Sequence, residues 1–163
     1  MKCLIFSDSH GSHFAMRKAL KLHSDCDIVF FLGDGLADFD MLAFGDNTKM
    51  WIAVRGNCDY DPYFKDRFVP KTDSITLFGK KIVLTHGDLY GVKSGEGGLI
   101  SLAREEEADI VLFGHTHRRR EFYHEGVYYF NPGSLTPSYP DRSSYGILTI
   151  DENNILLSHG YID

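Results

Sequence analysis

Seven residues with metal-binding side chains follow directly on short apolar stretches of this sequence. Their side chains are two carboxylates, one carboxamide and four imidazoles: Asp8, His10, Asp34, Asn57, His86, His115 and His117. Carboxylate oxygen and imidazole nitrogen are ligands that suit Mn²⁺, Fe²⁺, Co²⁺, Ni²⁺ or Zn²⁺. The pattern therefore predicts a site for divalent metal ions.

The number of these residues indicates two ions rather than one. A tetrahedral ion needs about four ligands, whereas seven suit a pair of ions that share a bridging carboxylate. Two ions about 3.5–4 Å apart can clamp a phosphate group and activate a water molecule between them. We therefore expect a hydrolase that acts on phosphate esters.

Each short motif taken alone has an ordinary structural interpretation. Asp8-Ser9-His10 is typical of a cap or turn, Gly33-Asp34-Gly35 is a common turn, and Asn57 tolerates a left-handed backbone. Gly114-His115-Thr116-His117 also fits a structural zinc pair. Every one of these motifs, however, follows an apolar run with the character of a buried strand. That joint placement favours a shared site.

The first half of the chain alternates apolar strands with helices. The expected strands are 2–7, 27–32 and 51–54, and the expected helices are 13–24 and 36–44. Ser12 is placed to cap the first helix. The face of that helix expected to be buried carries Phe14, Ala15, Ala19 and Leu22. This alternation favours a parallel βαβ core.

The second half is richer in antiparallel hairpins. Its expected elements are strands 74–78, 81–85, 109–113, 120–124, 127–130, 144–150 and 155–161, with a helix over 96–108. Tight turns are expected at Gly79-Lys80 and Glu125-Gly126. Two sheets packed face to face, with helices outside, would use both halves. The metal-binding residues would then lie beyond the carboxyl ends of the parallel strands.

The composition indicates one globular domain over residues 1–163. Of these residues 43% are hydrophobic and 25% are charged, and the formal net charge of −6 argues against a nucleic-acid partner. No apolar run approaches the roughly 20 residues that cross a bilayer, and no signal-peptide pattern is seen. Three widely spaced cysteines without a CxxC motif indicate a reducing compartment, so we expect a cytoplasmic location and no membrane partner.

Five blocks of the sequence together resemble the motifs of the calcineurin-like metallophosphoesterases. They are Asp8-x-His10, Gly33-Asp34, Gly56-Asn57-Cys58-Asp59, Thr85-His86-Gly87-Asp88 and Gly114-His115-x-His117. The likeness covers nearly the whole chain and is strongest to the small phosphodiesterases of the YfcE type. It implies an α/β fold, namely a four-layer α/β/β/α sandwich of two mixed sheets.

The resemblance also implies how the seven residues divide between two ions. The first ion would be bound by Asp8, His10 and His117. The second would be bound by Asn57, His86 and His115, with Asp34 as the bridge. The implied reaction is in-line attack on phosphorus by a hydroxide held between the ions, with Asp34, Asn57 and His86 at its centre. Mn²⁺ is our first expectation, with Ni²⁺, Co²⁺, Fe²⁺ or Zn²⁺ as alternatives, and a small phosphodiester is the expected substrate.

Cys58 stands where many members of the wider superfamily have a histidine that is thought to protonate the leaving group. The subgroup resembled here shares Gly-Asn-Cys-Asp. A thiol, with a reference pKa of about 8.5, is a poor proton donor to an alkoxide. We therefore expect no dedicated general acid and a preference for substrates with good leaving groups.

Weaker candidates surround these positions. The arginines Arg118, Arg119 and Arg120 either contact an anionic substrate or form a solvated strand face, which is the favoured interpretation. The segment 131–134 either shapes the wall of the site or forms an ordinary turn, and Tyr139 and Pro140 either rim the site or form a subunit contact. The remaining histidines are expected at the surface or in packing contacts: His13, His23, His124 and His159.

Two other functions remain compatible with the pattern. A nuclease of the same fold would use the same metal centre, but the acidic charge and the lack of a basic stripe argue against it. A binding scaffold, as the retromer subunit of this fold is thought to be, would act through protein contacts and a degenerate metal site. The complete set of seven residues argues against the scaffold. A homo-oligomer formed through the antiparallel half is compatible with all three functions.

Overall fold

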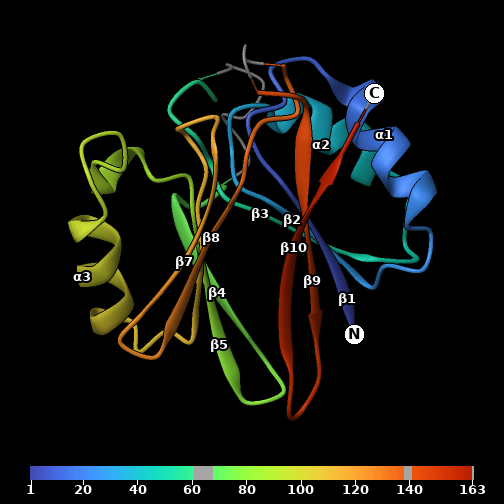
Figure 1. Ribbon diagram of the computed structural model, residues 1–163. Coiled ribbons are helices and arrows are strands. Elements are labelled where there is room, and N and C mark those ends of the chain that lie inside the picture. The colour runs from blue at the N-terminus through green and yellow to red at the C-terminus, as the bar shows by residue number, and fades with distance from the viewer. Residues whose placement is uncertain (61–67, 138–140, 163) are drawn as a thin grey trace.

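Two five-stranded sheets pack face to face in the computed structural model, with helices on both outer sides (Figure 1). The structure describes residues 1–60, 68–137 and 141–162. Tyr139 and Pro140, expected at the rim of the site or in a subunit contact, lie outside the described residues.

The first sheet contains the three parallel strands of the N-terminal half and the last hairpin. Its strands are β1 (Lys2–Phe6), β2 (Ile28–Phe31), β3 (Met50–Ala53), β9 (Ser144–Ile150) and β10 (Ile155–Tyr161). Their order is β10-β9-β1-β2-β3. β1 pairs in parallel with β2 and antiparallel with β9, so the sheet is mixed.

The second sheet is also mixed. Its strands are β4 (Thr72–Leu77), β5 (Lys80–Thr85), β6 (Ile110–Leu112), β7 (Arg119–His124) and β8 (Val127–Pro132). Their order is β4-β5-β6-β8-β7, with β5, β6 and β8 parallel. The helices are α1 (His13–Leu22), α2 (Leu36–Ala43) and α3 (Gly97–Glu105), with a short 3₁₀ turn, η2 (Asp88–Tyr90). These elements confirm the expected four-layer sandwich.

The uninterrupted apolar run of β1 explains the four layers. Successive side chains of a strand point to opposite faces, so Cys3 and Ile5 pack in the core between the two sheets. Leu4 and Phe6 pack instead with residues of α1 and α2 on the outer face. Because both faces are apolar, the strand must be covered on both sides.

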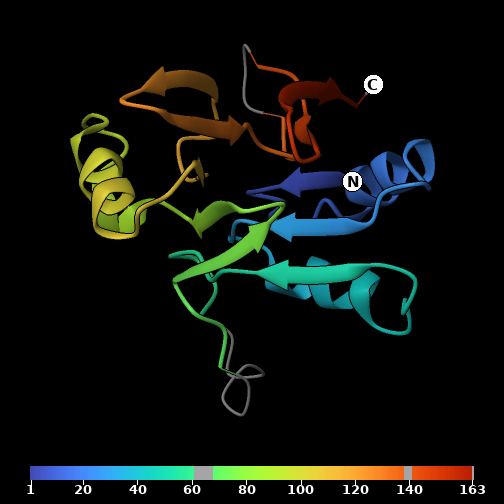
Figure 2. The same ribbon diagram turned by 90° about the horizontal axis from the view of Figure 1, so that it is seen from below.

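Helix α3 covers the opposite outer face, away from α1 and α2 (Figure 2). Its buried residues Leu99, Leu102 and Ala103 pack against Val83 of β5 and Val111 of β6. Ile100 is partly buried beside them. Within the described parts of the chain, no helix has the length and apolar character needed to cross a lipid bilayer.

The buried face of α1 agrees with the expected one at Ala19 but not at Phe14 or Leu22. Met16 and Ala19 are its buried residues, whereas Phe14 is 72% exposed and Leu22 is 62% exposed. Apolar residues occur around much of this short helix, so their spacing did not single out one face. Ser12 does precede α1, but its side chain makes no capping hydrogen bond.

The turn between β4 and β5 lies one residue earlier than expected. It is formed by Phe78 and Gly79, with φ of 50° and 73°, rather than by Gly79 and Lys80. Two consecutive positive φ angles match the right-handed twist of the paired strands. The expected turn at Glu125-Gly126 is confirmed, with φ of 48° and 85°.

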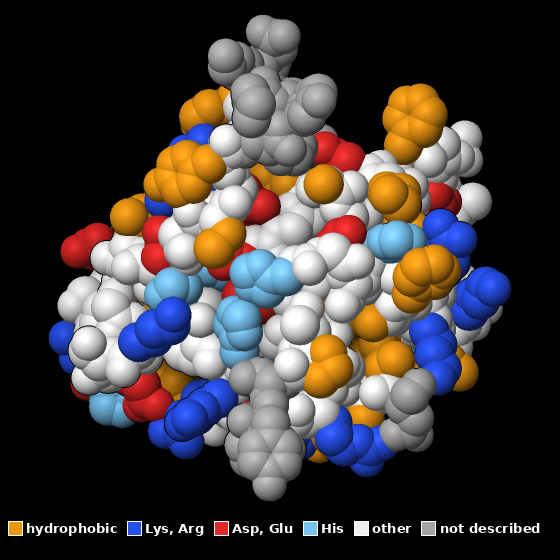
Figure 3. Space-filling model, turned by 90° about the horizontal axis from the view of Figure 1, so that it is seen from above, with side chains coloured by type: hydrophobic (Ala, Val, Ile, Leu, Met, Phe, Trp, Pro, Cys, Tyr) orange, Lys and Arg blue, Asp and Glu red, His pale blue; other side chains and the backbone are white. Residues whose placement is uncertain are grey.

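The loops after the parallel strands of both sheets meet at one edge of the sandwich. The amide of Asp8 donates to the carbonyl of Gly33 at 3.0 Å, which ties the loops after β1 and β2. The amide of Gly114 donates to the carbonyl of His86, also at 3.0 Å, which ties the loops after β6 and β5. Figure 3 looks onto this edge, where histidine side chains gather beside acidic ones.

Candidate metal centre

All seven residues expected to bind metal have their side chains at this edge. The Nε2 atoms of His10 and His117 lie 3.3 Å apart. Nδ1 of His115 lies 3.2 Å from Nε2 of His86, and Oδ1 of Asn57 lies 3.1 Å from the same Nε2. These contacts join loops from both sheets into one polar cluster.

The cluster divides into two groups around Asp34. One group is Asp8, His10 and His117, and another is Asp34, His86 and His115, each with potential ligand atoms within 4.8 Å of one another. Oδ2 of Asp34 lies 3.3 Å from Nε2 of His86 and 3.9 Å from Nε2 of His10. Asp34 therefore lies where a carboxylate shared by two ions would be needed, and its role as a ligand stays a prediction.

The carboxylate of Asp8 fits a bound cation. Its Oδ2 accepts hydrogen bonds from the hydroxyl of Ser7 at 2.5 Å and from the amide of His115 at 3.1 Å. Its Oδ1 is buried and has no hydrogen-bond partner of good geometry among the described residues. Nε2 of His117 lies only 3.1 Å from this oxygen. A buried carboxylate oxygen without a partner is costly, and a cation between it and the imidazole would satisfy both.

Hydrogen bonds prepare two of these side chains for metal binding. Nδ1 of His86 lies 2.7 Å from the carbonyl oxygen of Leu32, so in the neutral imidazole Nδ1 carries the proton and Nε2 carries the lone pair. Oδ1 of Asp34 accepts the amide N–H of Cys58 at 2.7 Å, which leaves Oδ2 facing the histidines. These hydrogen bonds use Nδ1 of His86 and Oδ1 of Asp34, and so they orient Nε2 and Oδ2 toward the cluster.

Five of the seven residues have left-handed backbone. Asp8, His10, Asp34, His115 and His117 have φ between 41° and 67°. Few residues other than glycine adopt this region, although aspartate and histidine do so more often than most. Such conformations cost about 1–3 kcal/mol each and cluster at functional sites. The loops therefore hold these side chains inward at the expense of stability.

Two glycines allow the loops to approach one another closely. A Cβ at Gly56 would overlap Oδ1 of Asp34 and lie 2.5 Å from its amide nitrogen. A Cβ at Gly114 would overlap the hydroxyl of Ser7 and lie 3.0 Å from Oδ2 of Asp8. Any other residue at either position would displace a carboxylate of the site.

Asp59 organises the loop that carries Asp34. Its buried carboxylate accepts four amide N–H groups, at 2.8 Å from Asp34, 2.9 Å from Gly35, 3.0 Å from Leu36 and 2.9 Å from Gly56. Gly35 and Leu36 form the N-terminus of α2, where a negative charge is favourable. Asp59 was not singled out from the sequence as a positioning residue, because its partners are backbone amides, three of them more than 20 residues earlier in the chain.

Residues at the end of β8 and just after it are hydrogen-bonded to the loops that carry the candidate ligands. Nδ2 of Asn131 donates to the carbonyl of Gly114 at 2.9 Å. The hydroxyl of Ser134 donates to the carbonyl of Asp8 at 2.8 Å. Asp38 supports the first loop in the same way, since it accepts the hydroxyl of Ser9 at 2.6 Å.

The charges of the cluster shift the pKa values of several of its side chains. Burial raises the pKa of Asp34, but hydrogen bonds from His86 and Cys58 outweigh it and hold that pKa well below its usual range. Burial lowers the pKa of His86, yet the carboxylates of Asp34 and Asp8 raise it overall. The carboxylate of Asp8, 3.1 Å from Nε2 of His117, likewise raises the pKa of that imidazole. The metal-free site therefore favours protons on these two imidazoles.

Cys58 lies beside the cluster, and its Sγ is within 4.8 Å of ligand atoms of His10 and Asp34. Partial desolvation and a hydrogen bond to Asp34 raise the pKa of its thiol to about 11. At neutral pH the sulfur therefore carries its proton and is a weak ligand.

The other histidines lie outside the two groups. Nε2 of His23 lies 2.8 Å from the hydroxyl of Tyr145, and Nε2 of His159 lies 2.8 Å from the carbonyl of Asn131. His124 is exposed on β7. His13 lies 3.8 Å from Asp38, so it supports the first loop from outside.

This fold and this edge of histidines and carboxylates define a metallophosphoesterase. A sequence profile of the calcineurin-like phosphoesterase superfamily domain matches residues 1–153. The chain therefore belongs to the calcineurin-like phosphoesterase superfamily, and the resemblance seen in its five sequence blocks is confirmed.

Individual relatives cover nearly the whole chain. Probable metallophosphoesterase YsnB of Bacillus subtilis is 32% identical over 155 residues, which are 94% of this chain and 86% of YsnB. Phosphodiesterase YfcE of Escherichia coli is 29% identical over 175 residues, which cover 96% of this chain and 91% of YfcE. The solved structure of YfcE superimposes with a TM-score of 0.70 at 25% identity over 100% of both chains.

The same fold is found in a protein named for vacuolar sorting. Vps29 of Cryptosporidium parvum superimposes with a TM-score of 0.74 at 21% identity, over 99% of this chain and 98% of Vps29. At this identity the likeness shows the fold alone.

Proposed function

We propose that this protein is a phosphodiesterase that hydrolyses small phosphodiesters with two divalent cations, of which Mn²⁺ is the first candidate. The observation that carries the proposal is the position of Asp34 between His10 and His86, at 3.9 Å and 3.3 Å. Asp8, His10 and His117 would bind the first cation. Asn57, His86 and His115 would bind the second, and Asp34 would bind both.

The cations would supply the reactive water and the charge that phosphate ester hydrolysis needs. When bound, they would lower the pKa of a water molecule between them and attract the negative charge of the phosphoryl oxygens. The carboxylates and imidazoles of this chain supply a dense set of ligands for that purpose. Their prior orientation by Leu32, Ser7 and Cys58 reduces the rearrangement needed on binding.

The exposure of the cluster supports access for a small substrate from one side. The side chains of Asp8 and His86 are fully buried, whereas those of His10 and His117 are 31% and 33% exposed. A phosphodiester would therefore approach over His10 and His117. Oxygen and nitrogen ligands without a thiolate suit Mn²⁺ and its neighbours better than soft ions.

Cys58 supports a preference for activated esters. Its thiol, with a pKa raised to about 11, is mismatched to proton donation at neutral pH. We propose that the leaving group departs without a dedicated protein acid, which favours aryl over alkyl esters.

The three cysteines support a reducing location. Cys3 and Cys26 are buried and free, and Cys58 is free and exposed. Free thiols are typical of proteins kept in reducing compartments. We therefore propose that the protein works in the cytoplasm.

The test is hydrolysis of bis-p-nitrophenyl phosphate and of the p-nitrophenyl monoester by protein stripped with chelator and then given Mn²⁺. Metal-restored diesterase activity that Asp34→Asn lowers at least about a hundredfold would support the proposal. Asp73→Asn, an exposed change on β4, is the matched control and should retain activity.

The other outcomes decide between the alternatives. Faster hydrolysis of the monoester than of the diester would contradict the diesterase proposal and indicate a phosphatase. Mn²⁺ binding without hydrolysis of either ester would favour a binding scaffold. Strong salt-dependent binding to DNA would favour a nuclease.

A further inference from the structure

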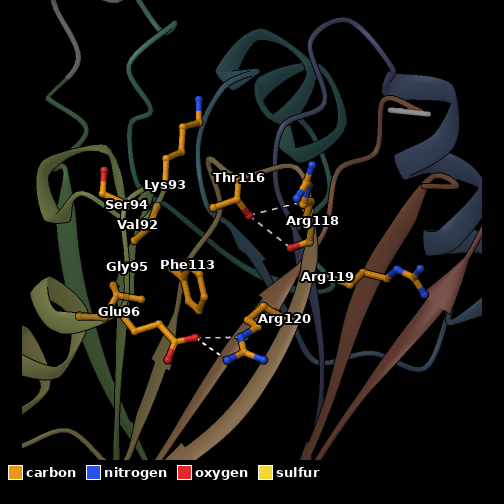
Figure 4. A pocket seen from close by; sticks show the side chains of 11 residues that line it. Val92, Lys93, Ser94, Gly95, Glu96, Phe113, Thr116, Arg118, Arg119 and Arg120 are labelled. Atoms are coloured by element: carbon orange, nitrogen blue, oxygen red, sulfur yellow. Dashed lines mark hydrogen bonds and ion pairs between the residues drawn. The ribbon is translucent and has the colours of Figure 1, made fainter. Parts of the chain in front are cut away.

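A groove of about 710 Å³ adjoins the candidate metal centre (Figure 4). One of its walls is the segment 92–96 before α3, and the opposite wall is the start of β7. Thr116, which lies between His115 and His117 in the chain, also lines it. A substrate bound over these histidines would therefore reach into the groove.

Four cationic side chains and one carboxylate line this groove, but two of the cations are already paired. The guanidinium of Arg120 binds Glu96 at 2.6 and 2.8 Å and forms one end of the groove (Figure 4). Arg119 is turned toward Tyr161 and Asp141, with its guanidinium carbon 4.9 Å from the Tyr161 ring centre. Neither side chain is left free to bind a ligand.

Lys93 and Arg118 differ from the paired arginines. Both residues are exposed, and among the described residues the side chain of neither makes an ion pair or hydrogen bond. Figure 4 shows them with Thr116 at the end of the groove away from the Glu96–Arg120 pair. On a chain with a net charge of −6 they form a local positive site.

The floor of the groove is apolar. Phe113 and Leu99 line it. Their residues are only 3% and 0% exposed, so both side chains are packed in the hydrophobic core. An apolar floor below two unpaired cations suits a ligand with an organic body and a negatively charged end.

We propose that the groove binds one ester substituent of the phosphodiester substrate, and that Lys93 and Arg118 contact a second anionic group, such as a phosphate monoester, on that substituent. This rests on the proposed function and narrows its substrate class. The guanidinium and the ammonium group both donate charge-assisted hydrogen bonds to phosphate oxygens. Arg118, which directly precedes β7, would then contact substrate, whereas Arg119 and Arg120 at the start of the strand would not.

The first experiment measures binding rather than activity. Isothermal titration calorimetry of the Mn²⁺-loaded protein compares thymidine 3′,5′-bisphosphate with thymidine 5′-phosphate, which lacks the second anionic group. We expect the bisphosphate to bind about tenfold more tightly. The double variant Lys93→Gln/Arg118→Gln should remove that difference. The control Lys21→Gln/Arg17→Gln removes the same number of charges from exposed positions of α1. This control should retain the difference in affinity between the two nucleotides.

The second experiment uses the p-nitrophenyl esters of the same two nucleotides. In the unaltered protein, KM should be about tenfold lower for the ester that carries a 3′-phosphate than for the ester that lacks it. In the double variant the two KM values should be equal. The double variant should hydrolyse bis-p-nitrophenyl phosphate at a rate within about threefold of that of the unaltered protein, since that ester carries no second anionic group.

Equal affinities in the unaltered protein, or a preference that persists in the double variant, would overturn the proposal. Hydrolysis of both esters without a preference would leave the proposed function intact and reject the groove. Tighter binding of the bisphosphate in calorimetry, without hydrolysis of either ester, would support the groove as a binding site and reject the proposed function.

Discussion

The Nε2 atoms of His10 and His117 lie 3.3 Å apart, although 107 residues separate the two histidines in the chain. Two imidazoles that bind one tetrahedral ion, each about 2.1 Å from it, place their nitrogens about 3.4 Å apart. The loops after β1 and β6 therefore already hold the spacing that a shared ion requires. The strained backbone at both residues is consistent with a geometry that the surrounding structure imposes.

Replacing His117 should remove one ion and leave the other. His117 belongs to the group of Asp8 and His10, so His117→Ala should lower bound Mn²⁺ from two ions to about one per chain. Elemental analysis after gel filtration measures this ratio. His124→Ala, on the exposed face of β7, should retain both ions. Retention of two ions by His117→Ala would contradict the assignment.

Removing the carboxylate of Asp59 should weaken both the fold and the site. Asp59→Ala leaves four amide N–H groups without an acceptor, and we expect a loss of about 3 kcal/mol in the free energy of unfolding. Mn²⁺ affinity should fall as well, because Asp34 is no longer held. Urea denaturation and calorimetry measure the two effects. Asp151→Ala, which removes an exposed hairpin carboxylate, should change neither much. An Asp59→Ala protein with ordinary stability and Mn²⁺ affinity would refute this role.

Metal affinity should fall as the pH is lowered. The neighbouring carboxylates raise the pKa of His86 and His117, and only the neutral imidazoles bind a cation. Below these pKa values each displaced proton weakens binding about tenfold per pH unit. Calorimetry at about pH 5.5 and about pH 7.5, in buffers of different ionisation enthalpy, should show weaker binding and proton release in acid. Equal affinity at both pH values would be incompatible with this view.

A histidine at position 58 should broaden the range of leaving groups. Cys58 lies within 4.8 Å of ligand atoms of His10 and Asp34, and an imidazole there has a pKa suited to proton transfer near neutrality. Cys58→His should therefore raise the rate for alkyl phosphodiesters relative to aryl ones about tenfold or more. Cys58→Ser serves as the control for loss of the thiol. An unchanged ratio in Cys58→His would mean that no proton donor is missing.

The strands, and the meeting of the seven candidate residues at one edge, were predictable because their signals are local. Apolar runs such as that of β1 are followed directly by polar residues, and the parallel arrangement brings these to one edge. The role of Asp59 was not predictable, because it binds backbone amides that carry no sequence signature. The exposed Phe14 and the groove at Lys93 depend on how segments distant in sequence pack together.

The most direct test of the central claim is anomalous diffraction from crystals soaked in Mn²⁺. We predict two Mn²⁺ peaks about 3.5–4 Å apart, with Asp34 between them, one ion bound by Asp8, His10 and His117 and the other by Asn57, His86 and His115. A single peak, or peaks away from Asp34, would contradict the two-cation centre.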